Sequence, residues 1–156
     1  MSPTIRVQSA PFDAAAESAL LTQGRADIGA IVSFVGLCRD EAGTLAALEL
    51  EHFPGMAEAE LERIALEAES RWPLLGITII HRFGKIAPGD AIVLVLTASS
   101  HRAAAFAAAE FLMDFLKSRA PFWKKEHGVA GARWIEPTSQ DRTDAERWDS
   151  RPQEPS

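Results

Sequence analysis

Blocks of apolar and polar residues alternate along the chain and predict a mixture of strands and helices. Apolar, β-branched or alternating stretches predict strands at 28–35, 45–53, 77–83 and 91–98, with a short last strand at 133–136. The second of these alternates leucine with glutamate, which is typical of a strand with one solvated face. Pro88-Gly89-Asp90 predicts the turn between the last two long strands.

Apolar residues at helical spacing predict three helices, at 14–22, 56–71 and 103–118. The middle helix carries five glutamates between positions 58 and 69, which we interpret as its solvated face. Ser99 or Ser100 can cap the third helix, and Ala120-Pro121 ends it.

The order of these elements favours an α+β fold with a mostly antiparallel sheet and helices packed against it. Neither a GxGxxG nor a GxxxxGK[ST] motif is present, so the sequence gives no support to a nucleotide-binding fold. The length predicts a single domain over residues 1–148. The polar, proline-rich residues 149–156 predict a disordered tail.

The net charge of −6 argues against nucleic-acid binding, which needs a basic face. Basic residues nevertheless gather locally at Lys117, Arg119, Lys124 and Lys125, a pattern that favours a small anionic ligand. No apolar stretch is long enough to span a bilayer, and the first residues lack a secretory signal pattern. We therefore expect a cytoplasmic protein that is not attached to a membrane.

Two lysines near the end of the third predicted helix are candidates for chemistry. Lys117 falls in the last helical turn, where a cation is also favoured simply by the helix dipole. Lys124 follows the stiff apolar segment Pro121-Phe122-Trp123. A partly desolvated amine near another cation can act as a nucleophile or proton carrier, while a protonated one binds phosphate or carboxylate. The sequence leaves both uses open.

A second cationic group lies at the start of the same helix. Ser99, Ser100, His101 and Arg102 could form an anion site with the first backbone N–H groups. The alternative is a helix cap followed by two exposed polar residues. Arg39, at the end of the first predicted strand, is a further candidate or a solvated loop residue.

The remaining reactive residue types give weaker signals. Cys38 is the only cysteine; it is either a small apolar filler or a thiol activated by the neighbouring arginine. His52 and His81 fall inside strand patterns and are interpreted as core or sheet-surface histidines. Met113 shares a helix face with Lys117, although methionine usually fills a core. No His, Cys or acidic pair has metal-ligand spacing, so no metal is expected.

Assembled, these motifs resemble the catalytic (large) subunit family of molybdopterin synthase. The matching stretches are Gly29–Gly36 with Arg39, Leu48–Met56, Arg71–Pro73, His81–Asp90, Ser99–Arg102, Met113–Glu126 and Arg147-Trp148. The Lys-x-Arg-x-Pro-x-Trp-Lys segment from Lys117 to Lys124 is the most distinctive of them. The resemblance covers residues 5–148; Leu37-Cys38 and the alanine-rich segment 103–109 depart from it.

The resemblance implies a sulfurtransferase that converts cyclic pyranopterin monophosphate into the molybdopterin dithiolene, without a cofactor of its own. Sulfur would come from the C-terminal Gly-Gly thiocarboxylate of a small ubiquitin-like carrier subunit. An α/β-hammerhead homodimer with one carrier at each end, a heterotetramer, is also implied. The expected catalytic residues are Lys117 and Lys124, and the expected substrate-binding residues are Arg39, His101, Arg102 and Lys124, with Phe34, Met113 and Phe122 as apolar walls.

Within that resemblance, His101 and Arg102 are expected to reach the site across the dimer interface. Two other classes of function stay open on the residues alone. A non-catalytic α+β domain could use the same cations to bind a phosphorylated ligand, and a pure partner-binding scaffold would need no chemistry at all.

Overall fold

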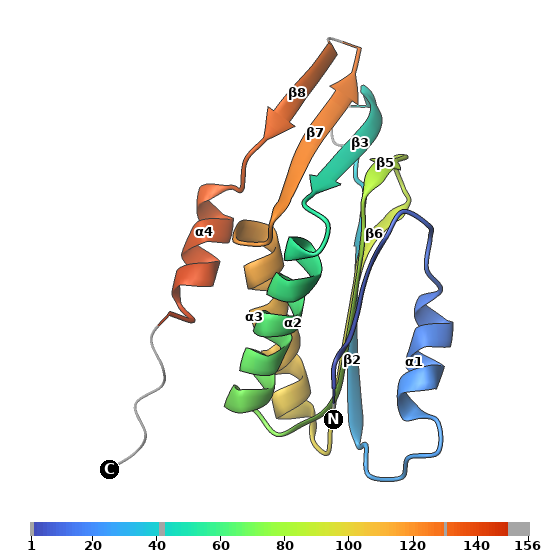
Figure 1. Ribbon diagram of the computed structural model, residues 1–156, viewed down its shortest axis with the longest axis vertical. Coiled ribbons are helices and arrows are strands. Elements are labelled where there is room, and N and C mark those ends of the chain that lie inside the picture. Colours follow the sequence, from blue (N-terminus) through green and yellow to red (C-terminus); the bar gives the residue numbers. More distant parts are fainter. Residues whose placement is uncertain (1, 41–42, 130, 150–156) are drawn as a thin grey trace.

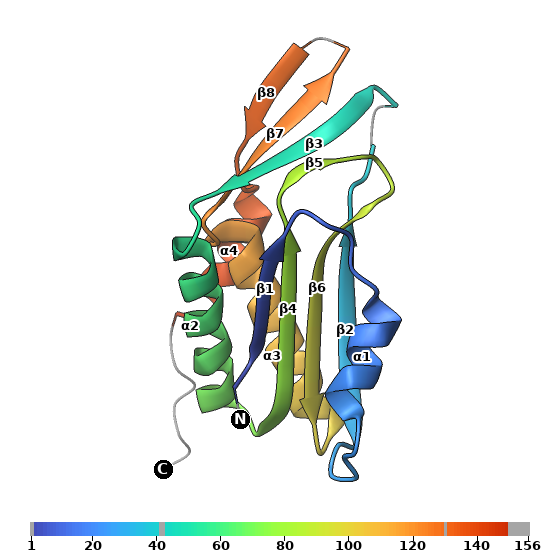
Figure 2. The ribbon, with the colours of Figure 1, turned by 45° about the vertical axis from the view of Figure 1, so that its right-hand side comes forward.

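The computed structural model describes residues 2–40, 43–129 and 131–149. Within these ranges the chain forms two four-stranded sheets and four helices (Figure 1). The larger sheet has helices on both faces, and the smaller sheet lies beyond one end of it (Figure 2). The expected α+β class with mostly antiparallel strands is confirmed.

The first sheet, sheet A, has the strand order β1-β4-β6-β2. Its strands are β1 (Thr4–Gln8), β4 (Leu74–Arg82), β6 (Ala91–Ser99) and β2 (Ala30–Leu37). Only the β1–β4 pair is parallel. The central strands β4 and β6 are almost entirely buried, which explains their continuous apolar sequences.

Three helices cover sheet A. They are α1 (Ala14–Thr22) on one face, and α2 (Met56–Arg71) and α3 (Arg102–Ser118) on the other (Figure 2). The main core lies beneath α2 and α3, where Ile77, Ile79 and Val95 of the sheet meet Leu61 and Leu112 of the helices. Each such side chain contributes roughly 1.5–3 kcal/mol when fully buried.

The second sheet, sheet B, has the order β5-β3-β7-β8 and is wholly antiparallel. Its strands are β5 (Gly84–Ile86), β3 (Leu45–His52), β7 (Phe122–Gly128) and β8 (Gly131–Ile135). One face covers a small core of Cys38, Leu48, Leu50 and Ile86. The chain then forms α4 (Ser139–Glu146), which returns to α3 (Figure 1).

The predicted bounds agree best with the structure where a helix or strand has a clear apolar pattern of its own. The bounds of α1 and α2 are as expected, and those of β3 differ by one residue. The predicted order was wrong in omitting β1, β5, β7 and α4. Strand β7 reads Phe-Trp-Lys-Lys-Glu-His-Gly, and this polar segment is extended because it pairs with β3 and β8.

The expected serine cap of α3 is wrong. Strand β6 continues through Ser99, which pairs with Ala30 and Leu74, and its hydroxyl donates to the Pro73 carbonyl at 2.8 Å. The cap position is therefore occupied by His101, whose side chain makes no capping hydrogen bond. Pairing on both sides of β6 extends the strand beyond the point where the serines suggested a helix start.

The C-terminal segment, by which we mean the described residues after α4 up to Asp149, packs along α2 and α3. Asp149, predicted to begin a disordered tail, pairs with Arg119, whereas residues 150–156 lie outside the described ranges. The extent of the domain, 1–148, stays a prediction. Among the described helices, none combines the length and apolar character needed to cross a membrane.

Candidate functional site

Lys117 and Lys124 lie where α3 ends and sheet B begins. Lys117 is exposed in the last turn of the helix, and Lys124 is half-buried in β7. The helix ends because the N–H groups of Arg119 and Ala120 both donate to the Phe115 carbonyl. The chain then reverses and enters β7, as the proline between the two lysines suggested.

The two ammonium groups interact electrostatically. Burial lowers the pKa of Lys124, and the charge of Lys117 lowers it further, while Asp141 of α4 opposes the shift. The two amines are thus within Coulombic reach of each other. In the described part of the chain, neither lysine forms a hydrogen bond or an ion pair.

Two histidines complete this group, which we call the lysine cluster: Lys117, Lys124, His81 and His52. His81, at the end of β4, is 5% exposed and stacks on Phe122 with ring centroids 3.7 Å apart. Burial lowers its pKa to about 4, although its hydrogen bond to the Arg82 carbonyl raises it, and Lys124, Lys117 and His52 lower it further.

Both histidines were expected in the core or on a sheet surface, and His81 is indeed a core residue, but their grouping with the two lysines was not predicted. A signal was available: each histidine lies at the C-terminal end of a strand pattern, next to the turn that follows the strand. What the pattern could not show is that β7 brings Phe122 between them. Several basic groups around an aromatic floor make a binding place for a small anion, with one amine that deprotonates readily.

His101 and Arg102 lie at the other end of α3. A helix rises 1.5 Å per residue, so Arg102 and Lys117 are separated by about 22 Å along its axis. Arg39 follows the end of β2. Strand β6 lies between β2 and β4, which carries His81, so Arg39 comes from a strand two places away from that of His81. Because of the length of α3, His101 and Arg102 of one chain lie far from the lysine cluster of that same chain.

The expected apolar walls have different environments. Phe122 forms the floor of the lysine cluster, and Phe34 is 37% exposed on the edge strand β2. Met113 is 9% exposed and packs in the main core, which is the usual role of a methionine. Roles for Phe34 and Met113 beside a substrate stay predictions.

Cys38 is a core residue of the smaller sheet. It is 3% exposed, and burial raises the pKa of its thiol, assisted by Asp90 and Asp40. The alternative of an activated thiol is wrong, because the surroundings are apolar and acidic. Within the described residues, no group of three or more His, Cys, Asp or Glu side chains could hold a metal ion.

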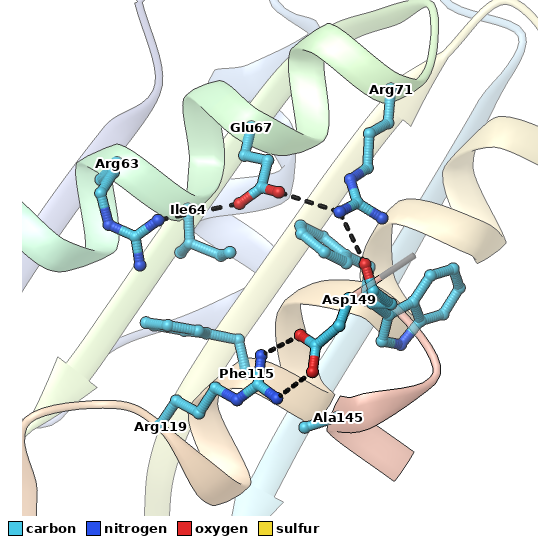
Figure 3. A pocket seen from close by; sticks show the side chains of 10 residues that line it. Arg63, Ile64, Glu67, Arg71, Phe115, Arg119, Ala145 and Asp149 are labelled. Carbon is cyan, nitrogen blue, oxygen red and sulfur yellow. Dashed lines mark hydrogen bonds and ion pairs between the residues drawn. The ribbon is translucent and has the colours of Figure 1, made fainter. Parts of the chain in front are cut away.

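A cavity of about 210 Å³ lies away from the lysine cluster, between α2, α3 and the C-terminal segment (Figure 3). We call it the arginine cavity; its lining includes Arg63, Glu67, Arg71, Phe111, Phe115, Arg119, Trp148 and Asp149. Glu67 bridges Arg63 and Arg71 at 3.7 and 2.9 Å, and Asp149 binds Arg119 through both oxygens, at 2.6 and 2.8 Å. Its guanidinium groups are all paired with carboxylates.

Comparison with known proteins assigns the chain to a family. The model of the family described as MoaE protein matches residues 7–119, well over half of the sequence. The chain belongs to the MoaE family. The molybdopterin synthase catalytic subunit of Mesorhizobium japonicum is 65% identical over 152 residues, which cover 96% of either chain.

Solved structures agree with this assignment. A molybdopterin biosynthesis MoaE protein from Burkholderia ambifaria has a TM-score of 0.82 at 48% identity, covering 96% of this chain and 99% of its own. A complex of subunits 1 and 2 of molybdopterin-converting factor from Helicobacter pylori contains the same fold, with a TM-score of 0.67 at 19% identity, covering 87% and 91%. The expected family, fold class and enzyme type are confirmed.

Proposed function

We propose that the chain transfers sulfur from a thiocarboxylated carrier subunit to cyclic pyranopterin monophosphate, with the lysine cluster as the reaction site. The observation that carries the proposal is a half-buried Lys124 beside Lys117, with no ion pair on either in the described residues. Isolated buried cations are costly, so they are retained where a ligand supplies the opposite charge. Relatives named molybdopterin synthase catalytic subunit supply the reaction.

The chemistry requires two anions to meet. The donor is a thiocarboxylate and the substrate a cyclic phosphodiester, and their repulsion must be offset before sulfur reaches carbon. Positive charge at the same place stabilises the phosphate oxygen released as the ring opens. We assign Lys117, which is exposed, to the thiocarboxylate, and the more deeply placed Lys124 to the pterin substrate, which it holds or protonates.

The partners follow from the same geometry. A carrier tail would reach Lys117 in extended form, and the Helicobacter pylori complex supports a small subunit as partner. Because α3 separates Arg102 from Lys117 by about 22 Å, we infer that a second copy supplies His101 and Arg102 in a homodimer, and that Arg39 binds the substrate anion. Two carriers complete a heterotetramer, which we place in the cytoplasm.

Lys117→Ala tests the proposal directly. With thiocarboxylated carrier and cyclic pyranopterin monophosphate, the variant should form no dithiolene product, while its circular dichroism and carrier affinity stay unchanged. Lys125→Ala is the matched control, because Lys125 lies on the opposite face of β7, with its ammonium 5.3 Å from the centre of the Trp134 ring.

Full activity of the Lys117 variant would overturn the assignment. Retained anion binding without turnover in the wild-type protein would instead favour the non-catalytic anion-binding domain. A neighbouring gene for a carrier ending in Gly-Gly is an independent check.

A further inference from the structure

The imidazole of His81 lies beneath the lysine cluster in a defined protonation state. Its Nδ1 is 2.8 Å from the Arg82 carbonyl oxygen. A carbonyl can only accept, so Nδ1 carries the ring proton and Nε2 keeps its lone pair. His81 is therefore a buried neutral base.

The groups that surround this base come from four elements and are basic or apolar. Phe122 of β7 covers one ring face, with an interplanar angle of 12°. The charged or titratable groups acting on the ring are Lys124 from β7, Lys117 from α3 and His52 from β3. On β4 itself, Arg82 points to the other face of sheet A, where its guanidinium donates to the Ser9 and Ala91 carbonyls.

Burial, the larger cause, and positive neighbours both disfavour a proton on His81, and a bound anion relieves only the second. A dianion between Lys117 and Lys124 would cancel their field at the imidazole, because opposite charges at comparable distances offset each other. The ring would then accept a proton at a higher pH than it does without the ligand. Stacking on Phe122 keeps the ring in place whether it is neutral or charged, since a cation also binds an aromatic face.

We propose that His81 is a proton-accepting group of this site, whose affinity for a proton rises when a dianion binds against Lys117 and Lys124, so that binding draws a proton onto the ring in the acid range. The proposal rests on the proposed function only in taking the lysine cluster as an anion site. One proton moves from solvent to Nε2, forming one N–H bond, and no other bond changes. During turnover, the added charge would help to hold the doubly charged phosphate produced when the cyclic phosphodiester opens.

A titration of the histidine ring signals by NMR tests the proposal on the full chain, with sulfate as the probe. Sulfate stays doubly charged over the histidine range, and sodium chloride at equal ionic strength provides the reference. In chloride, His81 should titrate near its pKa of about 4. In sulfate, the midpoint should rise by about one unit or more.

His127 is the internal control, because it pairs with Glu49 at 2.7 Å among the surface residues of sheet B. Exchanging chloride for sulfate should leave its ring signals unchanged. An unchanged His81 midpoint, or an equal response of the His127 ring signals to sulfate, overturns the proposal. Neither outcome depends on carrier or pterin, so a failure here is distinguishable from a failure of sulfur transfer.

Two variants separate proton uptake from simple packing. Lys124→Met should raise the His81 midpoint in chloride and reduce the further rise in sulfate, because one of the two cations is gone. His81→Phe keeps a ring against Phe122 but has no base. Close to the His81 midpoint in pH, calorimetry of sulfate binding in two buffers with different ionisation enthalpies should show proton uptake in the wild type and a loss of that uptake in His81→Phe.

A merely structural His81 would leave proton uptake unchanged in the Phe variant, which would overturn the proposal. In the synthase reaction, His81→Phe should change the acidic limb of the pH profile more than the rate at alkaline pH. An equal loss of activity at every pH would likewise contradict the inference.

Discussion

The lysine cluster and the arginine cavity are both rich in cations, but they differ in whether those cations pair with carboxylates. In the cavity, Arg63, Arg71 and Arg119 each pair with a carboxylate (Figure 3). In the cluster, the described contacts give Lys117 and Lys124 no ion pair, and their charges repel. Paired charges are neutralised in place by the protein itself, whereas a half-buried charge without a partner disfavours folding and is retained for a ligand.

The residue types agree with this contrast. Arginine has a planar fork of donors that can bind a carboxylate and a carbonyl at once, as Arg71 does with Glu67 and Trp148 while lying over the Phe111 ring. Lysine is a compact charge whose pKa falls readily on burial. The cavity therefore joins α2, α3 and the C-terminal segment, and the cluster is suited to proton transfer and anion binding.

After the loss of product formation expected for Lys117→Ala, the largest effect should come from Lys124→Met. Product formation should fall by roughly 1000-fold, comparable to the loss of a preorganised electrostatic group. The free energy of unfolding should rise, since the lowered pKa of Lys124 means that the fold disfavours its charge. Dithiolene formation and urea unfolding measure the two quantities. A similar loss of activity in Lys125→Met would contradict the comparison.

Acid should destabilise the protein through the lysine cluster. The folded pKa of His81 is about 4, below its ordinary value of 6.5, so its contribution is complete above pH 6.5 and is lost as the pH falls toward 4. The full shift corresponds to about 3 kcal/mol. Urea unfolding as a function of pH should show this loss, and His81→Phe should flatten it. An equally steep curve in that variant would exclude His81 as the cause.

In the arginine cavity, Trp148→Ala should affect stability without affecting chemistry. Trp148 packs against Trp72 and Phe111, with ring centroids 5.7 and 5.6 Å apart. Its indole N–H donates to the Asp114 carboxylate at 2.7 Å. Truncation of this half-buried ring should reduce the free energy of unfolding by about 2 kcal/mol. Activity per folded molecule should be retained; a loss of turnover in fully folded protein would show that the cavity serves the site.

Asp149→Asn should have the smallest effect. The Arg119–Asp149 pair is exposed to solvent, where ion pairs are screened and contribute little. The change in urea midpoint should be close to the limit of measurement and should vanish at high salt. A large, salt-resistant loss of stability would mean that this pair, too, anchors the C-terminal segment.

Local patterns were sufficient for much of the fold. The spacing of Leu61 and Ile64 among glutamates defined α2, and a proline between Lys117 and Lys124 indicated a chain reversal there. The reaction was inferred from the family resemblance, because no spacing of residues specifies a sulfur donor. These signals lie within short segments, where neighbouring residues largely determine conformation.

The sequence by itself thus determined the family, the α+β class and the residue types available for chemistry. Only the tertiary structure decided that the polar segment β7 pairs with β3, which brings Phe122 and Lys124 over His81. Strand pairing joins residues far apart in the chain, and burial then sets their charge states, so neither can be read from local periodicity.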